Sequence, residues 1–442
     1  MDNKRSKDLG WVLSANFAEG LPYAVITTLS VVMMADMGLS NTEVAAWTSL
    51  LAMPWSFKAL WSPWIGDTRR WMWLMQVALA VCISGVALSL LSSNWLVWCL
   101  IALTVGAFSS ATYDIACDGF YMKALDKDAQ SFFVGIRSTA YRLSMIFASG
   151  VLTTLVGLLS RSNGGDLTRA WILVMLGVGG LMLIFALAHR TWLPHLNRRT
   201  KDITTLETVE KTANEAERSD TDWVGAFAAF IRKPGLWFIL LFLLFYRLGE
   251  ALLSKMTILF LKAPVETGGL GLDNAEYGLI YGTVGVGMLT IGGILGGMLV
   301  SKYGLRKCVI PLALMLNVPD LLYVWMSIAQ PQSRLLIGSL VGVEQFGYGL
   351  GFTAYMVFML QSSQGKFSTS HYAILTALMA LGMNIPSMLS GWLQESLGYT
   401  QFFWAAVACT VPGMILSMIL WKGYPRGVKG LSKGSKRVVK GL

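Results

Sequence analysis

Long apolar runs recur along the whole of this 442-residue chain. A bilayer core ~30 Å thick needs ~20 mostly apolar residues per helix, whereas the strands of a membrane barrel would show ~10-residue alternating segments. The sequence therefore predicts an all-α integral membrane protein with twelve membrane-spanning helices. We expect these helices over residues 10–34, 43–64, 72–91, 95–118, 133–158, 169–190, 234–261, 275–300, 308–328, 334–360, 371–391 and 401–421.

The composition excludes a water-soluble protein. Hydrophobic residues make up 55% of the chain and charged residues 14%, against ~25% charged residues in soluble domains. All five cysteines fall inside predicted spans, and the three histidines are dispersed, so no metal site and no cofactor are expected. Tyr113-Asp114 matches half of an intramembrane aspartyl protease signature, but the partner Gly-x-Gly-Asp is missing. We therefore do not predict an enzyme.

The basic residues indicate the orientation in the membrane. Most of the 35 Lys and Arg fall in the loops on one side if both termini are cytoplasmic, as the positive-inside rule requires. The basic stretch after the last span is typical of an anchor against anionic lipid, and nucleic-acid binding is not expected. The bilayer and a small-molecule substrate are the expected partners, and a monomer is the expected state.

One long polar segment, residues 191–233, divides the spans into six and six. We predict an N-terminal bundle (1–190), a cytoplasmic linker (191–233), a C-terminal bundle (234–421) and a basic cytoplasmic tail (422–442). Two six-helix bundles joined in this way are the architecture of the major facilitator fold, in which the halves rock about a central site.

Eleven ionisable residues lie within the predicted spans, where each would cost ~2.5–3.5 kcal/mol at the bilayer centre if it faced lipid. This cost predicts that they pair or line a shared aqueous cavity. For Lys58 and Arg137, near cytoplasmic helix ends, snorkelling to the interface is the favoured interpretation. The set is Glu19, Lys58, Asp114, Asp118, Arg137, Arg142, Arg247, Glu250, Lys255, Asp320 and Glu344.

Asp114 and Asp118 are four residues apart and so share one helix face. Two stacked carboxylates repel each other, which favours proton uptake by one of them, and pairing with Arg137 or Arg142 is compatible with that role. We predict Asp114, Asp118, Glu19 and Glu250 as the proton-coupling acids. A proton gradient, rather than a cofactor, would then drive the cycle.

Arg142 and Arg247 are the deepest guanidinium groups, one in each half. Such donors suit a carboxylate or phosphate on a substrate. A structural ion pair between Arg247 and Glu250, three residues apart, is the alternative. We predict a substrate-binding set of Arg142, Arg247, Tyr113, Tyr141 and Tyr246.

The loops after the second and the eighth span are both short and basic. The first contains Asp67, Arg69 and Arg70, and the second contains Gly304, Arg306 and Lys307. The second resembles the facilitator loop pattern of Gly, acid, Gly and paired basic residues, with Ser301 where an Asp is usual. We predict that these six residues form a conformational latch; simple positive-inside flanking is the alternative.

Several segments together resemble the peptide/acetyl-coenzyme A transporter family of the major facilitator superfamily, in particular its bacterial anhydromuropeptide permeases. The segments are 17–22 (FAEGLP), 57–63 (FKALWSP), 114–118 (DIACD), 141–145 (YRLSM), 246–250 (YRLGE) and 367–375 (FSTSHYAIL). The resemblance implies proton-driven import of N-acetylglucosaminyl-anhydro-N-acetylmuramyl peptides across the bacterial inner membrane. It also implies that Asp114 and Asp118 are the coupling carboxylates.

Two other functions remain open from the sequence. One shares the fold and transports acetyl-coenzyme A or another organic anion, although several phosphates would need more basic lining than two arginines supply. The other is a membrane sensor that does not transport and signals through the 191–233 linker.

Overall fold

The computed structural model describes residues 3–125, 127–194, 223–365 and 367–423, and within these ranges every regular element is a helix. The predicted all-α class is therefore confirmed. Most of the predicted linker (195–222) and of the predicted basic tail (424–442) lies outside the described residues. We refer to residues 3–194 as the N-terminal half and to residues 223–423 as the C-terminal half.

In the N-terminal half, two long spans are interrupted by π-helical turns. The elements are α1 (Asn3–Ala24), the π-helix η1 (Val25–Leu29), α2 (Ser30–Asp36), α3 (Asn41–Leu51), α4 (Met53–Phe57), the 3-10 turns η2 (Lys58–Leu60) and η3 (Ser62–Trp64), α5 (Thr68–Ser89), α6 (Trp95–Ala124), α7 (Lys127–Ile146), the π-helix η4 (Phe147–Leu152), α8 (Thr153–Ser162) and α9 (Leu167–Trp192).

The C-terminal half repeats this pattern of long helices with local breaks. Its elements are α11 (Trp223–Ile231), α12 (Leu236–Phe245), α13 (Leu248–Lys262), the 3-10 turn η5 (Val265–Thr267), α14 (Asn274–Tyr277), the π-helix η6 (Gly278–Gly285), α15 (Val286–Tyr303), α16 (Leu305–Asn317), the 3-10 turn η7 (Val318–Asp320), α17 (Leu321–Ala329), α18 (Arg334–Ser363) and α19 (Ser368–Trp421).

Ten of the described helices are long and apolar enough to cross a membrane, and two differences separate this number from the predicted twelve runs. The run at 43–64 is broken after α3, where Pro54 begins the short helix α4 and 3-10 turns follow. The last two runs are joined in α19, which is kinked at Gly398 (φ 75°). A left-handed φ is easily adopted only by glycine, so Gly398 makes the sharp connection possible.

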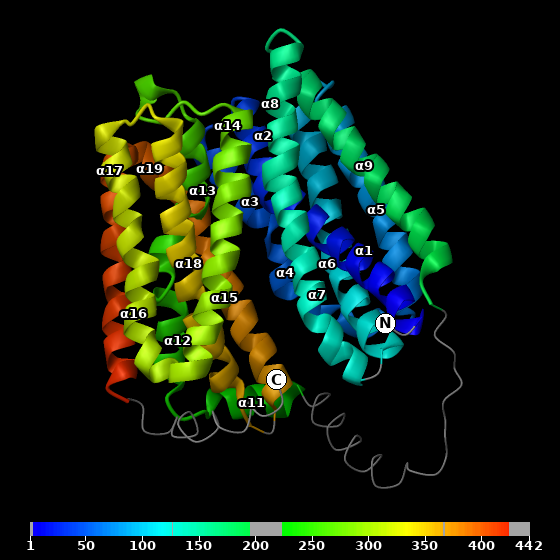
Figure 1. Ribbon diagram of the computed structural model, residues 1–442, viewed down its shortest axis with the longest axis vertical. Coiled ribbons are helices and arrows are strands. Elements are labelled where there is room, and N and C mark those ends of the chain that lie inside the picture. The colour runs from blue at the N-terminus through cyan, green and yellow to red at the C-terminus, as the bar shows by residue number, and fades with distance from the viewer. Residues whose placement is uncertain (1–2, 126, 195–222, 366, 424–442) are drawn as a thin grey trace.

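Within each half, the long helices pack side by side (Figure 1). α5 packs against α6 and α9, and α1 packs against α7; in the C-terminal half α15 packs against α18, and α13 against α19. Large apolar side chains such as Leu60, Trp64 and Leu335 are exposed on the outside of the bundle. In a bilayer these side chains would face acyl chains, which explains why so many large apolar groups are exposed.

The two halves approach each other most closely through glycines. A side-chain carbon on Gly282 of η6 would lie 2.1 Å from the Ser149 carbonyl oxygen of η4, and one on Gly391 of α19 would lie 2.2 Å from the Asn41 carbonyl oxygen of α3. These contacts, with α8 against α14, lie toward the end of the bundle opposite the marked termini (Figure 1). We call it the closed end.

The predicted latch loops make matching contacts inside each half. Arg69, at the start of α5, donates to the Arg190 carbonyl oxygen at the end of α9 at 3.0 Å. Arg306, at the start of α16, donates to the Trp421 carbonyl oxygen at the end of α19 at 2.7 Å. Asp67 caps α5 through the Arg70 amide. These bonds tie the third helix of each half to its sixth, so in this conformation the loops brace each half separately.

Candidate functional site

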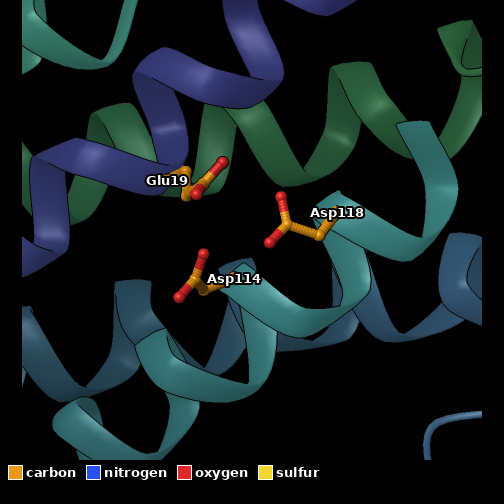
Figure 2. A group of neighbouring side chains, drawn as sticks. All are labelled: Glu19, Asp114 and Asp118. Carbon is orange, nitrogen blue, oxygen red and sulfur yellow. The ribbon is translucent and has the colours of Figure 1, made fainter. Parts of the chain in front are cut away.

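Three acidic side chains from two elements converge inside the N-terminal half (Figure 2). Glu19 comes from α1, and Asp114 and Asp118 come from successive turns of α6; one carboxylate oxygen of each lies within 4.8 Å of the others. The spacing of four residues puts the two aspartates on one face of α6, as predicted, and the structure shows that this face meets α1. Glu19 is 6% exposed. We call Glu19, Asp114 and Asp118 the N-terminal acid cluster.

Two basic side chains neutralise part of this cluster. Lys58, from the break after α4, forms an ion pair with Asp114. Arg137 of α7 forms an ion pair with Asp118, and its Nη2 lies 3.6 Å from Glu19 Oε1. Both bases therefore pair with acids while their side chains stay 34% and 25% exposed, and snorkelling to the interface stays a prediction. The broken second span turns Lys58 inward, because the chain no longer follows a helical path there.

The N-terminal acid cluster holds one more acid than base. Three carboxylates face two cations, and the buried Glu19 Oε2 has no hydrogen-bonding partner within the described part of the chain. An uncompensated carboxylate away from water is costly, and the cost disappears when a proton binds. The cluster can therefore take up one proton without breaking either ion pair.

Aromatic rings lie beside this cluster. Tyr23 of α1 packs edge-on against Trp55 of α4, with ring centroids 4.9 Å apart, and its ring lies 6.3 Å from that of Tyr141 of α7. Tyr141 was predicted as a substrate contact, whereas Tyr23 and Trp55 were not singled out. Aromatic faces of this kind bind apolar or sugar surfaces, and their hydroxyl and indole groups can hydrogen-bond.

Arg247 occupies the break between α12 and α13, where its φ of −116° departs from helical geometry. Its guanidinium donates to the Tyr348 hydroxyl and lies over the rings of Tyr348, Phe352 and Tyr355 at 5.3, 4.7 and 5.7 Å. The alternative ion pair with Glu250 is not formed. The helix break explains this, because three-residue spacing places side chains on one face only within a continuous helix.

Arg142 of α7 lies at the contact between the halves. Two of its guanidinium nitrogens lie 3.7 Å from the position that a side-chain carbon on Gly293 of α15 would occupy. Arg137, and not Arg142, takes the ion pair with the helix-α6 acids. Arg142 and Arg247 therefore belong to separate surroundings in this conformation, although each half supplies one, as predicted.

Tyr113 and Tyr246 occupy packing positions. The Tyr113 hydroxyl donates to the Ala15 carbonyl oxygen at 2.9 Å and accepts from Gln76, and the Tyr246 hydroxyl donates to the Gly351 carbonyl oxygen at 3.1 Å. Both side chains are almost fully buried. Their hydroxyls are committed to joining helices, so in this conformation neither of these two predicted substrate contacts presents a polar group to a ligand.

A second set of acids lies in the C-terminal half. Glu250 of α13, Asp320 of η7 and Glu344 of α18 each place a carboxylate oxygen within 4.8 Å of the other two, and all three side chains are buried. We call them the C-terminal acid cluster. Of these three acids, only Glu250 was predicted as a site residue. The signal that could have found the others was the presence of Asp320 and Glu344 inside apolar runs.

Comparison with known proteins places these two clusters in a family context. The sequence profile described as Major Facilitator Superfamily matches residues 12–262. The chain is 26% identical over 418 residues to the anhydromuropeptide permease of Escherichia coli (strain K12), covering 92% of this chain and 78% of that protein. It is 22% identical over 417 residues to a putative transporter, AmpG 4, of Rickettsia felis, covering 91% and 94%.

Solved structures with the same fold are also transporters. A bacterial homologue of the human lysosomal transporter Spinster, in an inward-facing and unoccupied conformation, superposes with a TM-score of 0.75 at 15% identity, covering 97% of this chain and 99% of that one. A D-xylose–proton symporter superposes with a TM-score of 0.67 at 14% identity, covering 95% and 98%. At these identities the likeness concerns the fold.

Proposed function

Because the chain belongs to the Major Facilitator Superfamily and is a multi-pass membrane transporter, we propose that it imports anhydromuropeptides together with protons by alternating access. The substrate class comes from the similarity to the E. coli anhydromuropeptide permease. With cytoplasmic termini, the closed end of the bundle would face outward. The inner membrane of a bacterium is then its location.

The uncompensated charge in the N-terminal acid cluster is the observation that carries proton coupling. Glu19, Asp114 and Asp118 share two cations, and Glu19 Oε2 has no partner within the described residues. A proton bound here when the site faces outside neutralises the cluster and favours closure around it; release inside restores the charge. Lys58 and Arg137 hold the aspartates in place throughout this exchange.

The substrate would bind between the halves. Tyr23, Trp55 and Tyr141 offer ring faces to the sugars. Arg247, held by Tyr348, supplies a positive charge for a peptide or muramyl carboxylate. One guanidinium and several rings suit a sugar-peptide with few charges better than a ligand with several phosphates, which favours muropeptides over acetyl-coenzyme A.

Uptake by membrane vesicles tests this proposal. Wild type should accumulate labelled disaccharide peptide when a proton gradient is imposed, and Glu19→Gln, Asp114→Asn and Asp118→Asn should lose accumulation against a gradient. Glu266→Gln, an exposed acid in the loop after α13, is the matched control and should behave as wild type. Unchanged coupling in all three cluster variants would remove these acids from the mechanism. Competition by coenzyme A but not by muropeptide would reassign the substrate.

A further inference from the structure

The C-terminal acid cluster differs from its N-terminal counterpart in forming no ion pair with any base of the described residues. Glu250, Asp320 and Glu344 are 6%, 1% and 2% exposed. Three adjacent charges in such surroundings would repel one another and lack water to stabilise them, so at least part of the charge must be neutralised by a ligand.

Asp320 points most directly to a bound ligand. The side chain comes from η7, where Pro319 interrupts the helix that α16 began, and neither of its carboxylate oxygens has a hydrogen-bonding partner within the described chain. Its Oδ2 lies 3.7 Å from the position that a side-chain carbon on Gly249 would occupy, which places the carboxyl group beside α13. Glu250 Oε2 is likewise without a partner.

Glu344 is different, because two donors stabilise its negative charge. The Tyr323 hydroxyl donates to Glu344 Oε2 at 2.7 Å, and Gln345 Nε2 donates to the same oxygen at 3.0 Å. Hydrogen bonds donated to a carboxyl group favour its charged form, and among the described residues neither Glu250 Oε2 nor either Asp320 oxygen receives one. Glu344 is therefore the ionised member, and Glu250 and Asp320 are the members that need protons.

Other groups near the cluster do not change this assignment. Arg247 is the nearest base along α13, and its charge acts on Glu250, but its guanidinium donates to Tyr348 and forms no ion pair with any of the three acids. One positive charge would still leave two of three ionised carboxylates uncompensated. Lys255, one turn further along α13, donates to the Thr27 carbonyl oxygen in the other half. Tyr281 of η6 and Tyr348 of α18 are also near, but tyrosine hydroxyls carry no charge at physiological pH and so supply no counter-charge.

We propose that Glu250, Asp320 and Glu344 form a second proton-binding site, at which Glu250 and Asp320 each hold a proton while Glu344 stays ionised. The proposal deepens the proposed function, since protons bound in both halves would make each half sensitive to the gradient. In the described conformation two protons neutralise the C-terminal acid cluster down to one charge. Loss of these protons would leave three adjacent carboxylates and drive the C-terminal half toward another arrangement.

Infrared difference spectroscopy of the full chain in liposomes tests the site without transport. Protonated carboxyl groups have a C=O stretching band separate from that of carboxylates. At neutral pH, Asp320→Asn and Glu250→Gln should each lose part of the protonated band. Glu344→Gln should lose carboxylate intensity only. Glu276→Gln, which removes an acid outside this cluster, is the matched control and should leave the protonated band unchanged.

Three outcomes decide the question. The proposal would be overturned if neither Asp320→Asn nor Glu250→Gln changed the protonated band. Both variants should fold, because an amide has nearly the shape and the lack of charge of a protonated acid. Replacing K⁺ by Na⁺ in the buffer at constant pH should leave the protonated band unchanged. If Na⁺ instead converted this band to carboxylate absorption, the cluster would be a site for a metal cation. If wild type shows the band but transports no muropeptide, the proton site stands and the proposed function fails.

Discussion

The ammonium of Lys255, in the C-terminal half, donates to the carbonyl oxygen of Thr27, in the N-terminal half, at 2.6 Å. Lys255 is 9% exposed and lies on α13, and Thr27 lies in the π-helix η1, so the bond links the first candidate membrane span of each half. Other polar bonds between the halves, from Asp36, Asn41, Thr42 and Arg161, lie toward the closed end. Opening that end must break this set.

Lys255→Met should favour opening of the closed end. A hydrogen bond from a charged donor contributes about 2 kcal/mol, which corresponds to a roughly 30-fold shift in the ratio of closed to open molecules. Pairs of spin labels on α8 and α14 would report the shift as a larger share of long distances. Lys255→Gln keeps a donor and should shift the ratio less. Equal distance distributions in wild type and Lys255→Met would contradict the assignment.

Asp36 and Lys262 form a buried ion pair between α2 and α13. Asn274 and Trp171 also donate to Asp36, at 2.6 and 2.9 Å. Asp36→Asn should destabilise the closed end by about 3–5 kcal/mol, because it leaves the Lys262 charge buried without its partner. The rate at which a thiol reagent labels a cysteine introduced at the closed end would therefore increase.

The double variant Asp36→Asn/Lys262→Met should recover much of that loss, since no charge is left uncompensated. Arg161→Gln removes the partner of Asp273 from an exposed ion pair, so it should destabilise the closed end much less than Asp36→Asn. An effect as large as that of Asp36→Asn would show that position along the closed end, rather than burial, sets the strength of these ion pairs.

Gly282→Leu should prevent closure of the same end. A side-chain carbon at Gly282 would lie 2.1 Å from the Ser149 carbonyl oxygen. This steric clash involves backbone, so the two helices would have to move apart to relieve it. We expect loss of uptake with normal amounts of folded protein, and spin-label distances typical of an open outer end. Gly287→Leu in α15 is the matched control, because nothing lies within 4 Å of that position. Retained uptake in Gly282→Leu would mean that these helices do not need to meet.

Asp273 should make stability depend on acid pH. Burial alone would raise the pKa of Asp273, but hydrogen bonds from the Glu276 amide and the Arg161 guanidinium outweigh burial and hold the pKa below its usual value. A depressed pKa stabilises the fold above the unfolded-state value of about 3.9, and this stabilisation is lost as pH falls through the lower folded-state pKa.

Thermal unfolding in detergent should therefore show no contribution of Asp273 to pH dependence between neutral pH and about pH 5, with a loss below about pH 4. Asp273→Asn retains a capping side chain for α14 and should flatten part of the acid-side loss. Asp273→Ala loses the cap as well, at a further cost of about 1 kcal/mol. The same acid-side slope in wild type and Asp273→Ala would assign the loss to other carboxylates.

The sequence predicted the long helices because hydrophobic length is a local property, and it placed Asp114 and Asp118 on one face because helical spacing is fixed. It did not predict that Lys58 faces Asp114. That contact depends on the break after α4, since a continuous helix would carry Lys58 past the cluster. Pro54 was visible in the sequence, but the direction of the chain after it was not.

The pairing of the arginines shows the same limit. Arg137 and Arg142 are five residues apart on α7, and either could in principle have met the α6 acids. Because of the rotation of α7 about its own axis in the bundle, Arg137 forms the ion pair with Asp118, and Arg142 lies near Gly293 of the other half. Helix rotation is set by packing against neighbours, which no local pattern specifies.

The amino-acid sequence by itself determined that this chain crosses a membrane as long helices and that acids and arginines lie within them, because the cost of hydrocarbon burial acts on each segment separately. Tertiary structure alone decided that Glu19 joins Asp114 and Asp118 with two cations, while Glu250, Asp320 and Glu344 meet without an ion pair to any base in the described part of the chain. Charge balance arises between helices far apart in the chain, and only their packing brings the charges within reach of one another.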